Sequence, residues 1–499
     1  MTQIRNNEDF ATSYDAVVIG SGPGGATLAL KLAQANMKVL VVERGDYFKP
    51  DETIDTNDFL YSRVKPGEDL FYVGGRSKFY GAALYRYREM DFDETHFEAG
   101  ISPAWPIDYG EMERYYCAAE KLFRVHGSPE GDPSEPWRSE PFPHSPLPND
   151  PLIEALSVKM AHAGTPMAAI PLGLDYGDKG NCALCSRCDA FHCRVDAKMD
   201  ADVAALRPAM ATGNVVLATR TECKRINLDP TGQRAEGVTV VRDGQTIDIH
   251  APIVSVSAGA PHSALLLRQS ATTQHSEGIG NHSGQLGRQV GGHSTGALFP
   301  IMSVARGMGQ RHTKTLAINA FYEGDADWQF PLGVIQVSGQ MPFWIGANPL
   351  KQPVFKIIAQ RTLTVFHMTE ATPDEDTGWA FDGDQLGEFT PPRHQARSYD
   401  ELRRRTIKAF GDAGYQVLRP NRPVEYWHLT GGAVMGADPA QSVVDVSGQV
   451  HGVDGLYVAD ASVPPTAAAV NTGLTIIALA LRTAEKIAQK QGASSAVLV

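Results

Sequence analysis

A glycine-rich turn lies between two short apolar runs near the beginning of the chain, in the segment DAVVIGSGPGGATLALKLAQANMKVLVVERG at residues 15–45. The apolar runs predict buried strands, and the residues between them have helical apolar spacing. Gly20, Gly22 and Gly25 fit the G-x-G-x-x-G pattern at the junction of strand and helix. In that place the glycines permit a tight turn, a close backbone approach to a pyrophosphate and close helix packing. The segment therefore predicts a βαβ dinucleotide-binding unit that opens a parallel sheet.

An acidic residue ends the second predicted strand. Glu43 follows Gly25 by 18 residues, at the position where a carboxylate binds ribose hydroxyls. A carboxylate there repels a 2′-phosphate, which argues against NADP. This unit alone does not show whether the bound dinucleotide is FAD or NAD.

Length and charge limit the remaining possibilities. The chain has 499 residues, of which 42% are hydrophobic and 20% charged, so it should form a globular protein of more than one domain. The formal net charge of −12 and the lack of a basic run argue against a nucleic-acid partner. The longest apolar stretch, residues 473–481, is shorter than the roughly 18 residues of a membrane helix. With its polar first residues, the protein is expected to be cytoplasmic, with no membrane partner.

The order of predicted elements indicates a discontinuous nucleotide domain. Residues from about 50 to 151 look like insertions with one clear helix, around Tyr109 to Phe123, and strand patterns return between residues 214 and 269. Residues 293–426 alternate strand-like runs with acidic loops, followed by a helix that Ser398 and Glu401 would open as a capping box. We predict an FAD-binding or NAD-binding domain of residues 10–100, 200–292 and 440–499. A substrate domain with insertions is expected to take residues 101–199 and 293–439.

Four further segments resemble the glucose–methanol–choline (GMC) oxidoreductases. They are GGRSKFYGA at 74–82, VSAGAPHSALLLRQS at 256–270, HLTGGAVMGADPAQSVVD at 428–445 and GLYVADASVPPTAAAVNTG at 455–473. Their order and spacing are similar to that family from residue 14 to about residue 488. The resemblance implies FAD as the cofactor, an α/β fold with a Rossmann-like parallel sheet, and a substrate domain built on an antiparallel sheet.

The resemblance also implies the residues that hold the flavin. Some members attach FAD through a histidine in the glycine-rich loop, but this chain has Phe79 at that place, so the FAD should be non-covalent. Asp460 corresponds to the contact with the ribityl chain. The implied FAD-binding residues are Gly20, Gly22, Gly25, Glu43, Arg44, Gly74, Gly75, Ser77, Gly81, Ala258, Asp460, Ala461 and Thr472.

Two residues match the catalytic pair of the family. His428 begins a segment like the family's H-x-x-G-T-x-x-M pattern, with Gly432 in place of the threonine, and Asn471 follows Thr466 by five residues. A neutral imidazole near pH 7 suits the base that removes a hydroxyl proton, so His428 is the expected base. An amide cannot take that proton, so Asn471 would donate a hydrogen bond to the developing alkoxide. The other histidines that we considered are expected to be structural or loop residues: His192, His262, His282 and His293.

Four cysteines crowd into one short segment. Cys182, Cys185, Cys188 and Cys193 form C-x-x-C-x-x-C-x-x-x-x-C, a spacing that suits zinc or an iron–sulfur cluster. Similar cysteines precede an A-K segment in family members that bind no metal. A reduced or locally disulfide-bonded loop is therefore the preferred interpretation, and a cluster remains the alternative. Cys117 and Cys223 are expected to be isolated core thiols.

These features together predict FAD-dependent oxidation of an alcohol group. The glycine-rich loop, residues 281–288 and the cysteine segment resemble a bacterial subgroup that acts on sugars, glycosides and aminoglycoside hydroxyls. The electrons would pass to O2 in an oxidase, or to a quinone or protein carrier in a dehydrogenase with a cluster. A GMC-like lyase that keeps FAD as structure is a third possibility, and a binding protein without activity is a fourth. The individual substrate and the oligomeric state are left open by the sequence.

Overall fold

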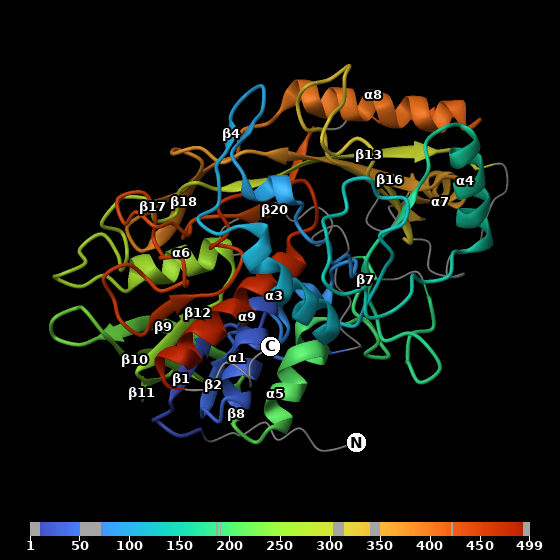
Figure 1. The fold of residues 1–499 in the computed structure, drawn as a ribbon. Helices are drawn as coiled ribbons and strands as arrows, with labels where there is room; N and C mark the ends of the chain where they lie inside the picture. The colour runs from blue at the N-terminus through green and yellow to red at the C-terminus, as the bar shows by residue number, and fades with distance from the viewer. Residues whose placement is uncertain are drawn as a thin grey trace.

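The computed structural model describes residues 10–49, 71–185, 188–189, 191–302, 314–339, 350–420 and 423–492. The first nine residues, and residues 50–70 of the predicted insertion, lie outside this described part. The chain forms one large parallel sheet and one large antiparallel sheet, with helices around both (Figure 1).

The parallel sheet collects its strands from distant parts of the chain. Its order is β21-β12-β1-β2-β8, and all neighbouring strands run parallel. Every residue of β1 and β2 is buried, as expected for strands that helices cover on both faces. The strands are β1 (Ala16–Ile19), β2 (Val39–Val42), β8 (Val215–Ala218), β12 (Ile253–Val256) and β21 (Leu456–Val458).

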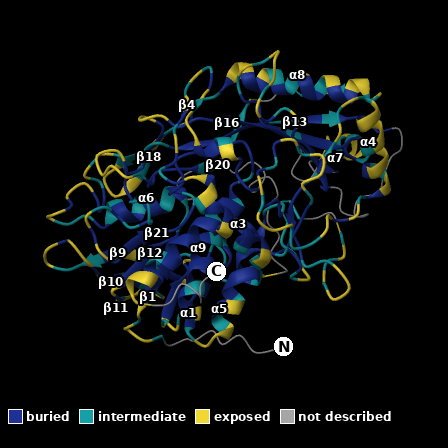
Figure 2. Ribbon diagram, viewed as in Figure 1, coloured by how far each residue is buried: buried dark blue, intermediate teal, exposed yellow. Residues whose placement is uncertain are grey.

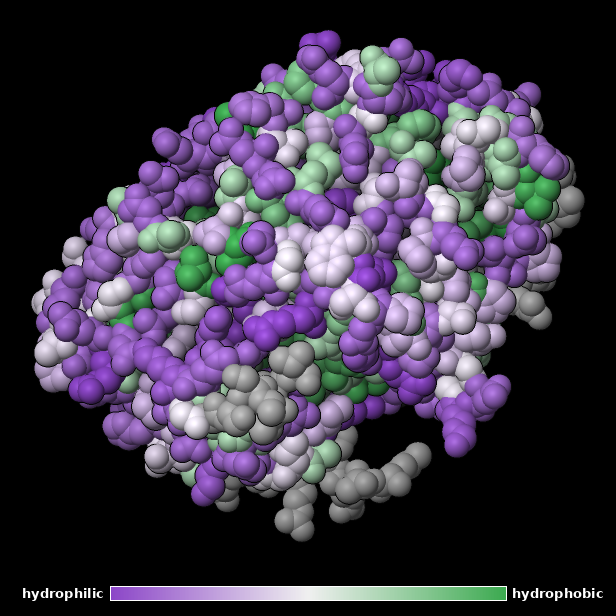
Figure 3. Space-filling view, viewed as in Figure 1, coloured by the Kyte–Doolittle hydropathy of each residue, from purple (hydrophilic) through white to green (hydrophobic). Residues whose placement is uncertain are grey.

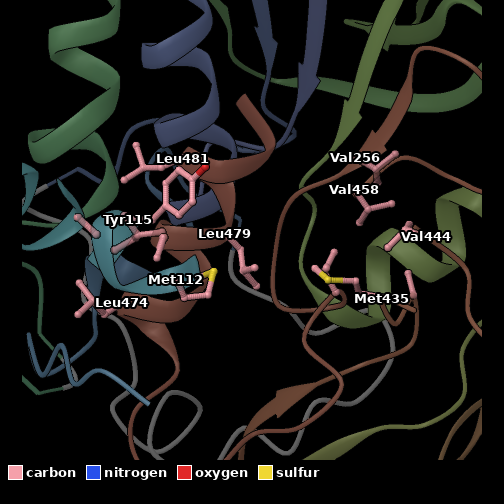
Figure 4. Close-up of a cluster of buried hydrophobic side chains, with 14 of the residues drawn as sticks. Met112, Tyr115, Val256, Met435, Val444, Val458, Leu474, Leu479 and Leu481 are labelled. Atoms are coloured by element: carbon pink, nitrogen blue, oxygen red, sulfur yellow. The ribbon is translucent and has the colours of Figure 1, made fainter. Parts of the chain in front are cut away.

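Helices of the nucleotide-binding part pack around this sheet, at the bottom of Figure 1. α1 (Pro23–Gln34) packs against α9 (Gly473–Lys490), which in turn contacts α3 (Tyr109–Leu122). Figure 4 shows Met112 and Tyr115 of α3 beside Leu474, Leu479 and Leu481 of α9 in the largest hydrophobic cluster. α5 (Arg207–Ala211) and α6 (Ala260–Gln269) complete this group, and a separate antiparallel sheet joins β9 (Thr221–Leu228), β10 (Ala235–Arg242) and β11 (Gln245–His250).

The second large sheet is antiparallel. Its order is β19-β13-β16-β15-β14-β6. β20 also pairs with β13, on the edge away from β16 that β19 shares. α8 (Ala396–Asp412) lies along this sheet at the top of Figure 1, and Figure 2 shows its inner side buried and its outer side exposed. The strands are β6 (Ala168–Ala169), β13 (Gly291–Pro300), β14 (Leu316–Ile318), β15 (Val334–Gly339), β16 (Thr364–Ala371), β19 (Val417–Leu418) and β20 (Glu425–Thr430).

Shorter elements complete the described part of the fold. These are α4 (Pro151–His162), α7 (Gln352–Gln360), β3 (Thr95–His96), β4 (Ile101–Ser102), β5 (Val125–His126), β7 (Leu172–Gly173), β17 (Gly378–Asp382) and β18 (Gln385–Thr390), with 3-10 turns at Gly75–Lys78 and Glu89–Phe92 and a π-helical turn at Asp202–Leu206. Figure 3 shows a face that is largely hydrophilic, with apolar side chains in small groups. No helix in the described ranges is both long and apolar enough to cross a membrane.

The predicted fold class is confirmed, while one predicted detail is wrong. α8 begins at Ala396 with Gln395 as its N-cap, so Ser398 lies inside its first turn and no capping box forms. A carboxylate from a distant segment caps the helix instead: Glu98 accepts hydrogen bonds from the backbone N–H groups of Arg397 and Ser398. Glu401 pairs with Arg404 and Arg405. The predicted domain boundaries stay a prediction.

Candidate active site

The predicted nucleotide-binding residues gather at the carboxyl edge of the parallel sheet. Gly20 follows β1 with φ 105°, a left-handed backbone conformation that favours glycine, and its N–H donates to the carbonyl of Val42. Gly25 packs so closely on Gly20 that a Cβ there would lie 2.1 Å from the Gly20 carbonyl oxygen. The turn thus brings the start of α1 directly over the end of β1.

The buried Glu43 carboxylate connects this turn to the glycine-rich loop. Its Oε2 accepts from the Oγ of Ser21 at 2.6 Å, and its Oε1 accepts from the N–H of Gly45 at 2.8 Å. The same Ser21 Oγ accepts from the N–H of Gly74 at 3.0 Å. Burial raises the pKa of the Glu43 carboxyl above its usual range. Arg44 instead points outward, its guanidinium 4.3 Å from the ring centroid of Phe71.

Asp460 links the ends of β12 and β21 at this edge. It follows β21, and its Oδ2 accepts from the N–H of Gly259 at 2.8 Å and from the Oγ of Ser263. Ser263 Oγ also accepts from the N–H of Ala258 at 3.0 Å. Ala461 accepts from the N–H of Gly431, next to the segment of His428, and Thr472 is the N-cap residue of α9.

The start of α1 suits the pyrophosphate of a dinucleotide. Its N-cap residue, Gly22, offers no side-chain cap, and Pro23 follows. A Cβ at Gly22 would meet nothing within 4 Å, whereas one at Gly24 would lie 1.9 Å from the carbonyl oxygen of Ala459. The helix therefore presents first-turn N–H groups and its positive dipole end toward open space at Gly22, which is the environment that phosphate oxygens require. The residues present fit FAD.

The glycine-rich loop forms a 3-10 turn beside that helix. Ser77 holds it: its Oγ donates to the carbonyl of Gly74 at 2.6 Å and accepts from the N–H of Ala201 at 2.9 Å. A Cβ on Gly75 would lie 3.1 Å from the Cα of Gly22, so the loop touches the start of α1.

Gly81, at the end of the loop, lies under an ion pair. Lys314 Nζ is 2.8 Å from Asp189 Oδ1, and a Cβ on Gly81 would be 2.3 Å and 1.8 Å from these two atoms. Asp189 belongs to the cysteine segment. That segment therefore reaches the glycine-rich loop, a contact that its cysteine pattern does not indicate.

A β-bulge positions His428. Across the pairing of β13 and β20, Gly291 lies opposite Thr430 and His293 opposite Trp427, so β20 has one residue more between the pairs than β13. His428 is in the bulge with φ 51°, a conformation uncommon for a residue with a side chain. Bulges re-aim side chains and occur beside active sites. Gly432, where the resemblance leads us to expect threonine, has φ 98°, which favours glycine.

A chain of hydrogen bonds passes through His428. Its Nδ1 is 2.9 Å from the Nδ1 of His293, and its Nε2 is 3.3 Å from the Nδ2 of Asn471. Asn471 Oδ1 accepts from the Nε2 of Gln336 at 2.7 Å, and His293 Nε2 is 3.1 Å from the carbonyl oxygen of Ala467. The two predicted catalytic residues thus lie in contact.

The direction of each hydrogen bond in this series follows from the Ala467 carbonyl at its end. The Ala467 carbonyl can only accept, so His293 Nε2 carries a proton. Burial lowers the pKa of His293 to about 4, so the ring is neutral and its Nδ1 must accept from the Nδ1–H of His428. Burial, followed by His293 and then Lys314, lowers the pKa of His428 well below its usual value. A neutral His428 with its proton on Nδ1 has an unprotonated Nε2, whose lone pair accepts from the Nδ2–H of Asn471.

The four cysteines of the sequence motif are unpaired in the structure, as are Cys117 and Cys223. Within the described ranges, no group of three or more His, Cys, Asp or Glu side chains is arranged to hold a metal ion. Lys198 holds the segment in place, because its Nζ donates to the carbonyls of Tyr80, Cys188 and Phe191. Burial raises the pKa of the Cys188 thiol to about 12.

Three residues beside the predicted pair carry no clear signal in the sequence. His293 was interpreted as structural, and Gln336 and Lys314 were not considered. None of them belongs to a local motif, and each reaches the site from β13, β15 or the residue stretch before β14. The sequence could have placed His293 in a strand, because it lies in a strand-like run. That it faces His428 is visible only in the structure, through the bulge.

The comparisons with known proteins agree with this arrangement. Two models described as GMC oxidoreductase match residues 72–294 and 382–480, and a model of an FAD-binding domain matches residues 15–52. Paromamine 6'-oxidase from Streptomyces fradiae is 29% identical over 95% of this chain and 91% of its own length. The 6'''-hydroxyparomomycin C oxidase from Streptomyces lividus is 28% identical over 97% and 93%.

The fold also matches a solved structure. Pyridoxine 4-oxidase from Mesorbium loti aligns with a TM-score of 0.64 and 18% identity, over 95% of this chain and 98% of that one. The family models, the relatives and the fold support the same conclusion as the glycine turn and the histidine–asparagine pair. The chain belongs to the GMC oxidoreductase family and is an FAD-dependent alcohol oxidoreductase.

Proposed function

We propose that this protein is an oxidase for an alcohol group of a sugar, an amino sugar or a similar polyhydroxylated compound, with His428 as the base. The observation that carries the proposal is the unprotonated Nε2 of His428 in contact with the amide of Asn471. The two similar Streptomyces proteins are named as oxidases of paromamine and of a hydroxyparomomycin, which supports this substrate class and O2 as the acceptor.

His428 would take the hydroxyl proton of the substrate at Nε2. Its Nδ1–H is already committed to His293, so the only basic nitrogen of the pair faces the substrate side. When the proton arrives, both ring nitrogens of His428 become donors, and His293 Nδ1 continues to accept from one of them. Bound FAD supplies the hydride acceptor.

Asn471 would position the same hydroxyl. Gln336 holds its Oδ1 and so directs its Nδ2–H toward the space next to His428 Nε2. A substrate hydroxyl that replaces the direct contact of the two side chains would give its proton to the imidazole and accept a hydrogen bond from the amide. That bond strengthens as negative charge develops on the oxygen.

Two further properties belong to the proposal. FAD would be bound without a covalent link, since Phe79 has no nucleophilic atom at the family's attachment position. The unpaired state of all six cysteines fits a reducing compartment such as the cytoplasm.

The test uses the purified FAD-loaded enzyme with paromamine, methyl glucoside and 1-butanol under anaerobic conditions. We expect flavin bleaching by at least one of them, recovery in air with H2O2 release, and release of FAD on acid precipitation. His428→Ala should slow bleaching by about 100- to 10,000-fold, while His282→Ala, outside the site, should not. Bleaching without recovery in air would identify a dehydrogenase instead. The alternative lyase would leave the flavin oxidised with every alcohol.

A further inference from the structure

Five buried hydroxyl groups on the antiparallel sheet have no hydrogen-bond partner among the described residues: those of Thr295, Ser338, Thr364, Thr369 and Thr430. Thr295, Ser338 and Thr364 are the ones that concern the site, and their exposed fractions are 2%, 7% and 3%. Burying a hydroxyl group without a partner is unfavourable. A ligand bound against the side of the sheet that these groups face would supply the missing hydrogen bonds.

The strand register places Thr295 and Thr364 on the face of the sheet that carries His293. Side chains alternate between the two faces, so Thr295 shares the face of His293 in β13. Thr295 lies opposite Met368 in β16, and Thr364 is four residues from Met368, so it also points to that face.

The same reasoning places Gln336 there, and Ser338 lies in a bulge beside Thr364. Gln336 of β15 lies opposite Phe366, which shares the face of Thr364. Ser338 is two residues beyond Gln336, and its neighbour Gly339 pairs with Thr364 across a bulge. The hydroxyls of Ser338 and Thr364 thus belong to adjacent strands at one level of the sheet.

Helices cover the opposite face of these strands. Ile335, Val337 and Val365 point there and pack in a hydrophobic cluster with side chains of α4 and α8. The polar face is turned instead toward the loop that carries Asn471, because Gln336 on this face bonds Asn471 directly.

The distance from the reacting group suits a sugar ring. Residues that share a face of a strand are about 7 Å apart, so Ser338 and Thr364 lie one such step beyond Gln336 and Asn471. An alcohol oxidised beside His428 would present substituents of the same ring, or of the next ring, at that level. Phe366 and Trp427, whose ring centroids are 5.0 Å apart, add partly buried apolar surface on the same face.

We propose that Thr295, Ser338 and Thr364 form a substrate subsite that hydrogen-bonds the hydroxyl or amino groups of a polyhydroxylated substrate. The inference rests on the proposed function and names the part of the site that selects the substrate. A hydroxyl side chain both donates and accepts, so it matches either substituent. An apolar alcohol leaves these groups unpaired, and a site built in this way discriminates against it.

The test compares variants on the two faces of one strand. Thr364→Val and Ser338→Ala remove the proposed contacts, and Thr369→Val is the matched control. Thr369 is also buried and its hydroxyl also lacks a described partner, but it lies on the face covered by α8. For each FAD-loaded protein, kcat/KM and the anaerobic Kd are measured with paromamine, methyl glucoside and 1-butanol.

Thr364→Val and Ser338→Ala should each lower kcat/KM for the hydroxylated substrate about 3- to 10-fold, mainly through KM, with a matching rise in Kd. Their kcat/KM for 1-butanol should be unchanged, and Thr369→Val should change neither value. Equal losses with both substrate types, or no loss with the hydroxylated one, would overturn the subsite. A wild-type enzyme that oxidises 1-butanol but neither hydroxylated compound would also overturn it while alcohol oxidation stands. If no alcohol bleaches the flavin, the proposed function fails and the subsite with it.

Discussion

The Nδ1 atoms of His428 and His293 lie 2.9 Å apart, although 135 residues separate the two histidines in the chain. His293 is completely buried and has its own proton on the nitrogen that faces the Ala467 carbonyl. It therefore acts on His428 as an acceptor and selects the tautomer of that ring. This role makes His293 a positioning residue.

Replacing His293 by alanine should lower kcat/KM roughly 10- to 100-fold, which is less than the loss expected when His428 itself is replaced. His428 could then place its proton on either nitrogen. Since the Nδ1–H of His428 also loses its acceptor, the acid limb of the pH profile of kcat/KM should shift as well. His293→Asn keeps an accepting oxygen and should recover part of the rate. An unmoved profile in both variants, at equal FAD content, would contradict the assignment.

Two neighbouring glycines at the start of α1 should respond differently to alanine. A Cβ at Gly22 meets no protein atom, so Gly22→Ala should fold with an unchanged Tm as the apoprotein but bind FAD at least 10-fold more weakly, because the backbone can no longer approach the pyrophosphate. A Cβ at Gly24 overlaps the carbonyl of Ala459, so Gly24→Ala should lower the Tm even without FAD. Thermal unfolding and flavin titration of both variants check this. Equal behaviour of the two variants would argue against the pyrophosphate position.

Lys198 should control the access to the cysteine segment. Lys198→Met removes the donor of three carbonyls, among them those of Cys188 and Phe191, and should destabilise the protein by about 2–4 kcal/mol. The thiol of Cys188 should then react faster with a disulfide reagent in the folded protein. Lys224→Met, at an exposed ion pair with Glu222, serves as the control, because such pairs contribute little. An unchanged labelling rate in Lys198→Met would show that other contacts hold the segment.

The buried carboxyl of Glu370 should make stability depend on pH. Burial, and then Asp91, raise its pKa to about 8. An unfolded chain releases this proton near pH 4.3, so the stabilising contribution is full below that pH and is lost as the pH rises through 8. Between these values the loss approaches about 1.4 kcal/mol per pH unit.

Glu370→Gln cannot ionise and should escape this loss. Its free energy of unfolding relative to the wild type should therefore improve from pH 5 to about pH 8 and level off above that, as denaturant titrations at several pH values would measure. Glu236→Gln, at an exposed position, should show no such trend. A constant difference between Glu370→Gln and the wild type would mean that the carboxyl is ionised in the folded protein at neutral pH.

Local sequence was sufficient for the nucleotide-binding turn. Gly20, Gly22 and Gly25 act within one strand–turn–helix unit, where spacing along the chain equals position in space, and β1, α1 and β2 form there as predicted. The family resemblance, which the comparisons confirm, also identified FAD and alcohol oxidation.

Contacts between distant strands were decided only by the tertiary structure. The capping of α8 by Glu98 joins segments about 300 residues apart, and the pairing of His428 with His293 and the hold of Gln336 on Asn471 depend on strand register and on one bulge. Alternation along a strand shows which residues share a face, but it does not show which strand lies opposite or where an extra residue turns a side chain. For that reason the sequence by itself predicted the base and its amide partner, and the folded sheet determined which nitrogen of His428 is unprotonated.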